Sequence, residues 1–332
     1  MADGYRLYGS EMSPYSVKVR SYLRYKELLH SWLVRNADTQ AEYQRYAKIQ
    51  IIPLVVTPQD EALQDSTPII ERVERDHPTP SIHPSDPVTA FLSALLEEFG
   101  DEWGNKWMFH FRWAREVDQV SSAGRIARGM MPAATDEMNA GLAAQIRARM
   151  IDRVWFVGSS PQTAPQIEDS FAAALSLLDA HLATRSYLFG ARPSFGDFGL
   201  WGQIYEAWTD PTAGALIEGR AHHLLDWVHR MLWPRADGAF ENWDTLAPTL
   251  APVLAGPVGQ LFLPWTLANA AAITAGQQEF RVQLAGRPWT QKPQKYHAKS
   301  LQVLRAKYAA VGDRKALDAV LDSVGCRAAL AA

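Results

Sequence analysis

Hydrophobic and polar positions follow two different patterns along the chain, and the change falls near residue 80. Up to about Asp76, short apolar runs typical of strands alternate with the spacing of amphipathic helices. We expect strands at residues 5–8, 32–34, 54–57 and 62–64, and helices beginning at Ser13, near 41–48 and at Ser66. This order predicts a βαβ unit followed by ββα, that is, a small α/β domain.

A proline-rich segment from His77 to Pro87 interrupts both patterns and is typical of a linker. Beyond it the apolar positions follow helical spacing. We expect helices from Asp86 to about Asp118, over 135–157, and over 167–182, with no comparable strand pattern before Phe280. The chain is therefore predicted to have two domains, an α/β domain over 1–78 and an all-helical domain over 86–332.

Two further segments carry local signals. Ser194 and Asp197 have the spacing of a capping box at the start of a helix. The longest uncharged stretch runs from Thr245 to Gln278 and contains four prolines, which we expect to break any continuous helix. It is therefore interpreted as a buried, irregular segment and not as a membrane span.

Composition narrows the class of protein. The chain has 332 residues, is 47% hydrophobic and carries a formal net charge of −3, so it can bury a large core and has no overall basic field that would favour nucleic acid. The first four residues lack the pattern of a secretory signal. A single cysteine, Cys326, argues against a disulfide framework. The expected location is the cytoplasm.

The turn Ser13-Pro14-Tyr15-Ser16 follows a predicted strand and opens a predicted helix. The active-site turn of a thioredoxin-type domain is built in this way, but here serine stands at both positions where redox proteins keep their thiols. Because Cys326 lies far along the chain, the turn cannot exchange electrons between sulfurs of its own. A sulfur used there must arrive with a ligand, which indicates a thiol cosubstrate.

Four motifs follow one another along the chain: the Ser13 turn, Ile52-Pro53-Leu54, Leu63-Gln64-Asp65-Ser66, and the segment from Tyr187-Leu188-Phe189-Gly190 to Asp197. Together they resemble the glutathione S-transferase superfamily over residues 5 to 235. The resemblance implies a thioredoxin-like N-terminal domain, an all-α C-terminal domain, glutathione as cosubstrate and a homodimer.

The resemblance also implies roles for single residues. Pro53 would follow a cis peptide bond and Ile52 would pair through its backbone with the cysteinyl part of glutathione. Asp65 and Ser66 would hold the γ-glutamyl end, which agrees with the affinity of a helix N-terminus for a carboxylate. The simpler interpretation of Ser66 is that it caps its helix.

Ser13 fits both a helix N-cap and a hydroxyl that supports the glutathione thiolate. Ser16 and Tyr8 are alternative hydroxyl donors. On the acceptor side, Trp107 and Phe111 belong to an aromatic stripe on a helix that lines the substrate pocket in this superfamily. Packing in the core is the alternative for both, and His110 among them is interpreted as a packed, hydrogen-bonded residue.

The chain departs from the family pattern in three places. Ile51 stands where many members have a polar glutathione contact, so that contact comes from Gln50, Lys48 or another residue, or is missing. Asp65 replaces the commoner glutamate. The chain also extends past about residue 235. A basic stretch in this extension is either a solvated face or a lid or contact for an anionic ligand; it contains Arg287, Lys292, Lys295, Lys299, Arg305 and Lys307.

The spacing of His222, Asp226 and His229 could suit a metal, but three candidate ligands without a second motif indicate a polar helix face, and no metal is predicted. The leading interpretation is a glutathione-dependent transferase or lyase acting on a small hydrophobic electrophile, with no nucleic-acid or membrane partner. The alternative is a non-catalytic glutathione transferase-like protein that binds a ligand or partner in the same cleft.

Overall fold

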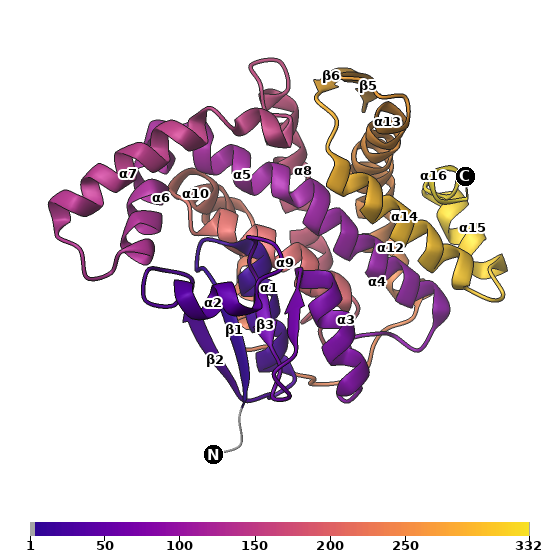
Figure 1. Cartoon of the computed structure of the whole chain (residues 1–332). Helices are drawn as coiled ribbons and strands as arrows, with labels where there is room; N and C mark the ends of the chain where they lie inside the picture. The colour runs from indigo at the N-terminus through magenta and orange to yellow at the C-terminus, as the bar shows by residue number, and fades with distance from the viewer. Residues whose placement is uncertain (1–3, 332) are drawn as a thin grey trace.

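The computed structural model describes residues 4–331 and begins with a four-stranded sheet of order β2-β1-β3-β4. The strands are β1 (Tyr5–Gly9), β2 (His30–Val34), β3 (Leu54–Val56) and β4 (Ala62–Gln64). β1 runs parallel to β2 and antiparallel to β3, and β4 is antiparallel to β3. The predicted βαβ and ββα units are confirmed (Figure 1).

Helices cover both faces of this sheet because neighbouring strand residues point to opposite sides. Leu7 and Val55 belong to the main core with side chains of α1 (Pro14–Tyr25) and α3 (Ser66–Asp76). Tyr8, the next residue of β1, packs instead with Tyr43 of α2 (Gln40–Tyr46). The small domain thus has three layers, with α1 and α3 on the side of the helical domain.

The helical domain begins at Pro87, and its first predicted helix differs from the structure. Instead of one helix to Asp118, α4 (Pro87–Phe99) continues through a π-helical stretch, η1 (Gly100–Gly104), into α5 (Asn105–Ala114), and the chain turns at Arg115, whose backbone is extended. The predicted helix over 135–157 likewise ends at Ile151 and is followed by a short 3-10 helix. The remaining elements before residue 235 are α6 (Glu116–Met130), α7 (Asp136–Ile151), η2 (Val154–Val157), α8 (Ala164–Leu182), α9 (Phe195–Trp208), α10 (Pro211–Arg220) and α11 (His222–Arg230).

α9 lies at the centre of the molecule, against both α4 and α1. A Cβ atom on Gly199 would lie 2.7 Å from Cγ of Glu97 in α4, and one on Gly202 would lie 2.6 Å from the carbonyl oxygen of Pro14. The predicted capping box is confirmed: Ser194 and Asp197 bond each other's backbone N–H groups. The small domain is therefore in direct contact with the central helix.

The extension does not have the irregular structure expected of it. α12 (Trp243–Val253), a π-helical stretch η3 (Leu254–Phe262) and α13 (Leu263–Thr274) follow without interruption, so the prediction that four prolines break the helix was wrong. A proline removes one backbone N–H donor, and its ring clashes with a carbonyl group one turn earlier in the helix. The wider turn of a π-helix can accommodate both effects. The continuous helix Trp243–Thr274 is long and apolar enough to cross a membrane, but buried core helices of globular proteins meet the same criterion. In its most apolar 18-residue segment, 44% is buried inside the structure.

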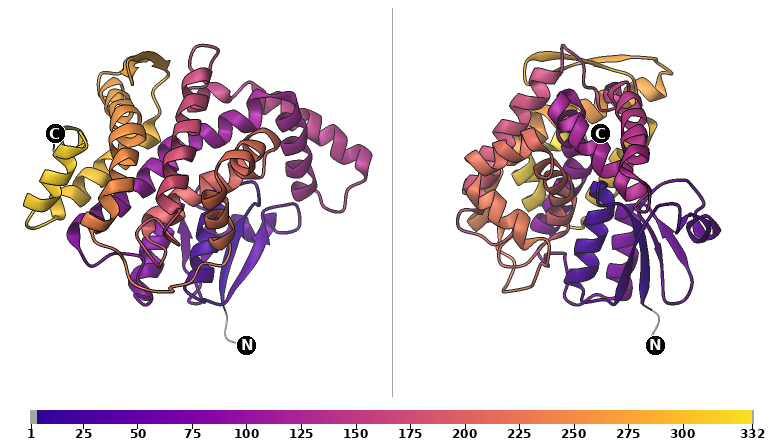
Figure 2. Two further views of the ribbon diagram at one scale, coloured as in Figure 1. Left: turned by 180° about the vertical axis from the view of Figure 1, so that it is seen from behind. Right: turned by 90° about the vertical axis from the view of Figure 1, so that its left-hand side faces the viewer.

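The rest of the extension consists of a hairpin, β5 (Phe280–Leu284) and β6 (Arg287–Gln291), and of α14 (Lys295–Ala310), α15 (Lys315–Ser323) and α16 (Arg327–Leu330). The hairpin is the exception to an all-helical C-terminal part. The extension and the α6–α7 hairpin lie at opposite ends of the helical domain (Figure 2). Cys326 is fully buried there, with its sulfur 3.5 Å from the carbonyl oxygen of Leu254.

Candidate functional site

Three chain segments meet at one edge of the small sheet. Tyr8 pairs with Leu54, and Leu54 pairs with Gln64. The chain therefore leaves β1, enters β3 and leaves β4 at the same edge, which brings the Ser13 turn, Ile52-Pro53 and Asp65-Ser66 together. α1 and α3 both begin here, and Nζ of Lys18 lies 3.4 Å from Oγ of Ser66.

Ser13 occupies the N-cap of α1. Its backbone is extended, and its hydroxyl oxygen accepts a 3.3 Å hydrogen bond from the N–H of Ser16. This confirms the capping interpretation and leaves the hydroxyl proton available, since an N-cap oxygen acts only as acceptor. The alternative hydroxyls are less suitable, because Ser16 and Tyr8 are both fully buried whereas Ser13 is partly exposed.

The loop before Ser13 is fixed by a buried arginine of α5. Nη1 of Arg112 donates to the carbonyl oxygen of Met12 at 3.0 Å. The same guanidinium pairs with Glu206 at 2.7 Å and with Asp210 at 2.8 Å, and all three side chains are buried. Burial raises the pKa of Glu206 to about 7, against the opposing effect of Arg112. The helical domain thus holds the Ser13 loop in place.

The second segment carries the predicted cis proline. The Ile52–Pro53 peptide bond is cis, which confirms that expectation. Within residues 4–331 the backbone N–H and C=O of Ile52 form no hydrogen bond, so both remain open to a ligand. The side chain of Ile51 is 40% exposed and brings no polar group, while the Gln50 amide accepts from Arg35 at 2.9 Å.

The third segment is the N-terminus of α3. Asp65 stands at the N-cap position with φ 76°, and its side chain makes no capping bond. The interpretation of Ser66 as the cap was therefore wrong, since Ser66 is the first helical residue. The first N–H groups of this helix keep their capacity for a carboxylate. Asp65 itself accepts a 2.5 Å hydrogen bond from the hydroxyl of Tyr296, which comes from α14 of the extension.

A buried ion cluster lies behind this helix terminus. Lys18 pairs with Glu97 at 2.6 Å and with Asp101 at 2.7 Å. Burial disfavours the Lys18 ammonium, but the two carboxylates outweigh it and raise its pKa. Burial raises the pKa of Asp101 to about 7, although Lys18 opposes the shift. Burial therefore outweighs the pairing with Lys18 in its effect on the pKa of Asp101.

The structure places Trp107 and Phe111 in the core, against the expectation that they contact the acceptor. Each is 1% exposed; Nε1 of Trp107 donates to Oγ of Ser170, and Phe111 packs on Phe171 with ring centres 4.9 Å apart. This face of α5 turns toward α8, which explains the burial. His110 is buried and hydrogen-bonded to Ser159 and Glu168, as interpreted.

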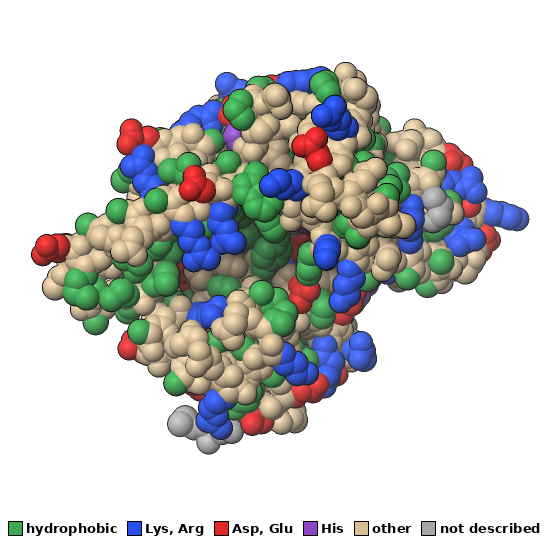
Figure 3. Space-filling view, turned by 45° about the horizontal axis from the view of Figure 1, so that its top comes forward, with side chains coloured by type: hydrophobic (Ala, Val, Ile, Leu, Met, Phe, Trp, Pro, Cys, Tyr) green, Lys and Arg blue, Asp and Glu red, His purple; other side chains and the backbone are tan. Residues whose placement is uncertain are grey.

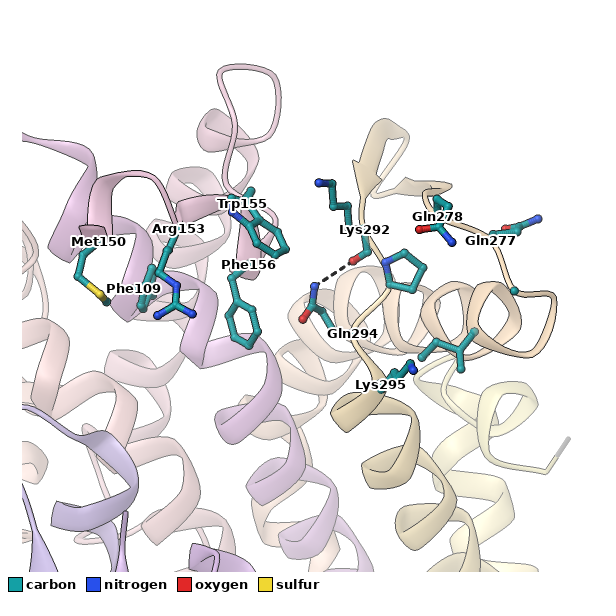
Figure 4. Close-up of a pocket in the computed structure, with 13 residues that line it drawn as sticks. Phe109, Met150, Arg153, Trp155, Phe156, Gln277, Gln278, Lys292, Gln294 and Lys295 are labelled. Atoms are coloured by element: carbon teal, nitrogen blue, oxygen red, sulfur yellow. Dashed lines mark hydrogen bonds between the residues drawn. The ribbon is translucent and has the colours of Figure 1, made fainter. Parts of the chain in front are cut away.

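A neighbouring residue of α5, Phe109, instead lines a cavity of about 900 Å³. Figure 4 shows Trp155 and Phe156 on one side of this cavity and Lys292, Gln294 and Lys295 on the other. In the space-filling view, a hollow with hydrophobic walls and several Lys and Arg side chains at its rim separates the small domain from the helical one (Figure 3). Sequence reasoning missed the cavity; the basic stretch was its only sequence signal.

His222, Asp226 and His229 lie on the exposed face of α11. No group of three or more His, Cys, Asp or Glu side chains in the described part of the chain is placed to hold a metal ion.

The sequence matches two protein-family models. Residues 7–81 match the glutathione S-transferase N-terminal domain and residues 131–230 match the glutathione S-transferase C-terminal domain. Together they cover just over half of the chain and leave the extension outside. Among proteins with curated descriptions, none matches the sequence.

Solved structures similar to this chain come from bacteria and a plant. The β-etherase LigF from Sphingobium sp. strain SYK-6 is 16% identical with a TM-score of 0.51, over 69% of this chain and 95% of that one. A Tau class glutathione S-transferase from mango, Mangifera indica, is 18% identical with a TM-score of 0.43, over 76% and 100% of the two chains. A glutathione S-transferase from Methylobacterium radiotolerans, in complex with glutathione sulfonate, is 19% identical with a TM-score of 0.42, over 72% and 98%.

At these identities the structural likeness concerns the fold, and the two domain matches carry the assignment. With a thioredoxin-like domain, a helical domain and both family matches in the expected order, this chain belongs to the glutathione S-transferase superfamily.

Proposed function

We propose that this protein is a glutathione-dependent transferase or lyase in which Ser13 supports the glutathione thiolate. The observation that carries the proposal is the meeting of three unsatisfied groups at one sheet edge. These are the hydroxyl proton of Ser13, the free backbone of Ile52 and the uncapped N-terminus of α3. They match a thiol, a peptide and a carboxylate, the three parts of glutathione that such a site must bind.

The chemistry follows from these contacts. A free thiol has a pKa near ~8.5, and a hydroxyl donor together with a helix N-terminus favours its thiolate. The thiol proton leaves to solvent, and the sulfur attacks an electrophilic carbon to form a thioether. The leaving group departs with the bonding electrons, or the nucleophile adds to a double bond or opens a ring. Ser13 donates to the sulfur and does not itself form a bond to substrate.

The acceptor in this proposal is a small hydrophobic electrophile. Trp107 and Phe111 have no part in binding it, because both are buried. Since Phe109 is partly exposed and lines the large cavity, it takes their place. The proposal includes a homodimer, as the family resemblance implies, and a cytoplasmic location, as expected from the N-terminal sequence and the single cysteine.

A second candidate is a non-catalytic protein that binds a ligand in the same cleft. The exposed, apolar Ile51 favours this alternative. It offers no polar contact beside Ile52, which weakens the binding of glutathione. Binding of glutathione without turnover would identify this alternative.

The test combines titration calorimetry with a panel of electrophiles. Aryl halides and epoxides represent substitution and ring opening, and β-aryl ethers are included because one structural relative is named a β-etherase. Ser13→Ala should leave glutathione affinity within about twofold, lower the conjugation rate ~10- to 100-fold and raise the pKa of the bound thiol. Ser13→Thr retains both cap and donor and should restore most of the rate.

Ser16→Ala is the matched control, since Oγ of Ser16 is buried and has no hydrogen-bond partner among residues 4–331. It should leave the rate unchanged. An unaltered rate in Ser13→Ala removes Ser13 from the mechanism, and failure of the wild-type protein to bind glutathione at millimolar concentration overturns the proposal as a whole.

A further inference from the structure

One wall of the large cavity lies within the C-terminal family match, and the opposite wall belongs to the extension outside it. One wall comes from the end of α7 and from η2, with Trp155 46% and Phe156 43% exposed. The opposite wall comes from the end of α13 and from the connection between β6 and α14 (Figure 4). Both exposed aromatic side chains face space that the extension encloses.

Hydrogen bonds hold the two walls at a fixed separation. Nε2 of Gln291, the last residue of β6, donates to the carbonyl oxygen of Phe156 at 3.1 Å, and its Oε1 accepts from Trp265 and Trp289. Gln294 and Asn269 bond each other reciprocally, backbone to side-chain amide, at 2.7 and 2.9 Å. The cavity is therefore preformed, as small-molecule sites usually are.

The charged side chains that line the cavity are all basic. Arg153, Lys292 and Lys295 contribute to its lining and no acidic residue does. Elsewhere in the basic stretch, Arg287 pairs with Asp169 and Lys307 pairs with Glu71. Within residues 4–331, by contrast, none of the three cavity cations is in an ion pair. In the basic stretch, Arg287 and Lys307 are therefore engaged in ion pairs within the fold, whereas Lys292 and Lys295 remain available to a ligand.

The cations stand next to the aromatic rings. Nζ of Lys292 lies 5.1 Å from the ring centre of Trp155, and the rings of Trp155 and Phe156 meet edge to face at 6.3 Å. A flat ring stacked on this pair brings a substituent within reach of an ammonium group. We propose that this cavity binds a planar aromatic anion, such as an aromatic carboxylate or sulfonate.

The cavity lies near the candidate glutathione site at one point of its lining. Lys295 lines the cavity, and the next residue, Tyr296, donates a hydrogen bond to Asp65 at the N-terminus of α3. If the ligand is the acceptor in the conjugation reaction, this part of the inference rests on the proposed function. The cavity then selects electrophiles that carry a negative charge away from the reacting carbon.

The experiment measures binding without glutathione, so it is independent of catalysis. Titration calorimetry with 2-naphthoate and with its uncharged counterpart 2-naphthalenemethanol separates charge from ring stacking. The wild-type protein should bind the anion about fivefold to tenfold more tightly than the alcohol. The double variant Lys292→Gln/Lys295→Gln should abolish this preference, and Trp155→Ala should weaken both ligands by at least about threefold.

Lys315→Gln is the control, because Lys315 is exposed and lies outside this cavity. It should bind both ligands like the wild type. Equal affinity for the two ligands, tighter binding of the alcohol, or no saturation with either at millimolar concentration overturns the inference.

Glutathione titration of the same samples separates the two ideas. Glutathione binding and turnover of a neutral aryl halide without naphthoate binding would refute the cavity inference alone. Naphthoate binding without any glutathione binding would refute the proposed function and leave the anion site standing.

Discussion

The hydroxyl of Tyr296 donates a 2.5 Å hydrogen bond to Oδ2 of Asp65, although 231 positions separate the two residues in the sequence. A second bond links the same helices, since Nζ of Lys307 in α14 lies 2.7 Å from Oε1 of Glu71 in α3. The extension is thus fastened along α3, at the residue that the family resemblance assigns to the γ-glutamyl end of glutathione.

Tyr296→Phe should tighten glutathione binding. In the proposed site the tyrosine hydroxyl competes with the ammonium group of glutathione for the Asp65 carboxylate, so removing the hydroxyl frees an acceptor worth about 1 kcal/mol, or ~3- to 10-fold in Kd. Calorimetric titration measures it. Tyr308→Phe on the same helix is the control, because its hydroxyl bonds to Asp318 away from the site. Weaker binding by Tyr296→Phe would show that the hydroxyl helps to bind the ligand, and unchanged binding would show that it has no influence. Either result contradicts the prediction.

Removal of the extension after Gly286 should destabilise the whole protein. The lost segment includes Trp289, Leu304 and Leu317, each fully buried in the main core. Burying one such side chain contributes about 1.5–3 kcal/mol, comparable in sum to the net stability of a domain. Aggregation or a melting temperature lowered by more than about 10 °C is expected by calorimetry. Truncation is therefore a poor test for a lid, and a wild-type melting curve would contradict this assignment of the core.

Gly202→Ala should separate the small domain from α9. The added Cβ would stand 2.6 Å from the carbonyl oxygen of Pro14, a backbone atom that cannot turn away. We expect a loss of about 1–3 kcal/mol in the free energy of unfolding, measured by urea denaturation. Gly219→Ala is the control: this helical glycine has nothing within 4 Å of its Cβ direction, so the change should stabilise by up to about 1 kcal/mol.

Lys106 should give the protein a stability that rises with pH. Its ammonium is buried among Trp103, Trp265 and Trp289, and it donates to the carbonyl oxygen of Val157 at 3.2 Å. Burial lowers the pKa of Lys106 well below its usual 10.5, so between the lowered value and 10.5 the unfolded chain binds the extra proton. The free energy of unfolding then increases with pH by up to about 1.4 kcal/mol per unit.

Urea denaturation between pH 7 and pH 10 measures this effect. Lys106→Met should flatten the profile and equal or exceed the wild type in stability at pH 7. Lys18→Met is the contrasting variant, because it strands the carboxylates of Glu97 and Asp101 and should be strongly destabilising. A Lys106→Met profile parallel to the wild type would mean that the indole rings keep the ammonium charged in the fold.

Local patterns in the sequence predicted local features well. The strands of the small domain, the capping box at Ser194 and the N-cap at Ser13 all depend on residues close together in the chain, and the structure has them. The cis bond before Pro53 was implied by the family resemblance, and the structure has it as well.

What failed depended on long-range packing. A stripe of aromatic residues does not reveal which neighbour each side chain faces, so the burial of Trp107 and Phe111 against α8 could not be foreseen. The four prolines indicate a break, but η3 and its neighbours accommodate them in one helix. The contact of Tyr296 with Asp65 joins segments that are distant in the sequence, and no local pattern around either residue predicts it.

The lone thiol has a consequence for the chemistry of a cell under oxidative stress. Cys326 is fully buried and burial raises its pKa to about 12, so at neutral pH it offers no reactive sulfur. If glutathione binds as proposed, the described residues offer no accessible thiol with which its oxidised form could make a mixed disulfide. Peroxide, which shuts down thiol-dependent enzymes, would then find no exposed cysteine sulfur in the described part of this chain.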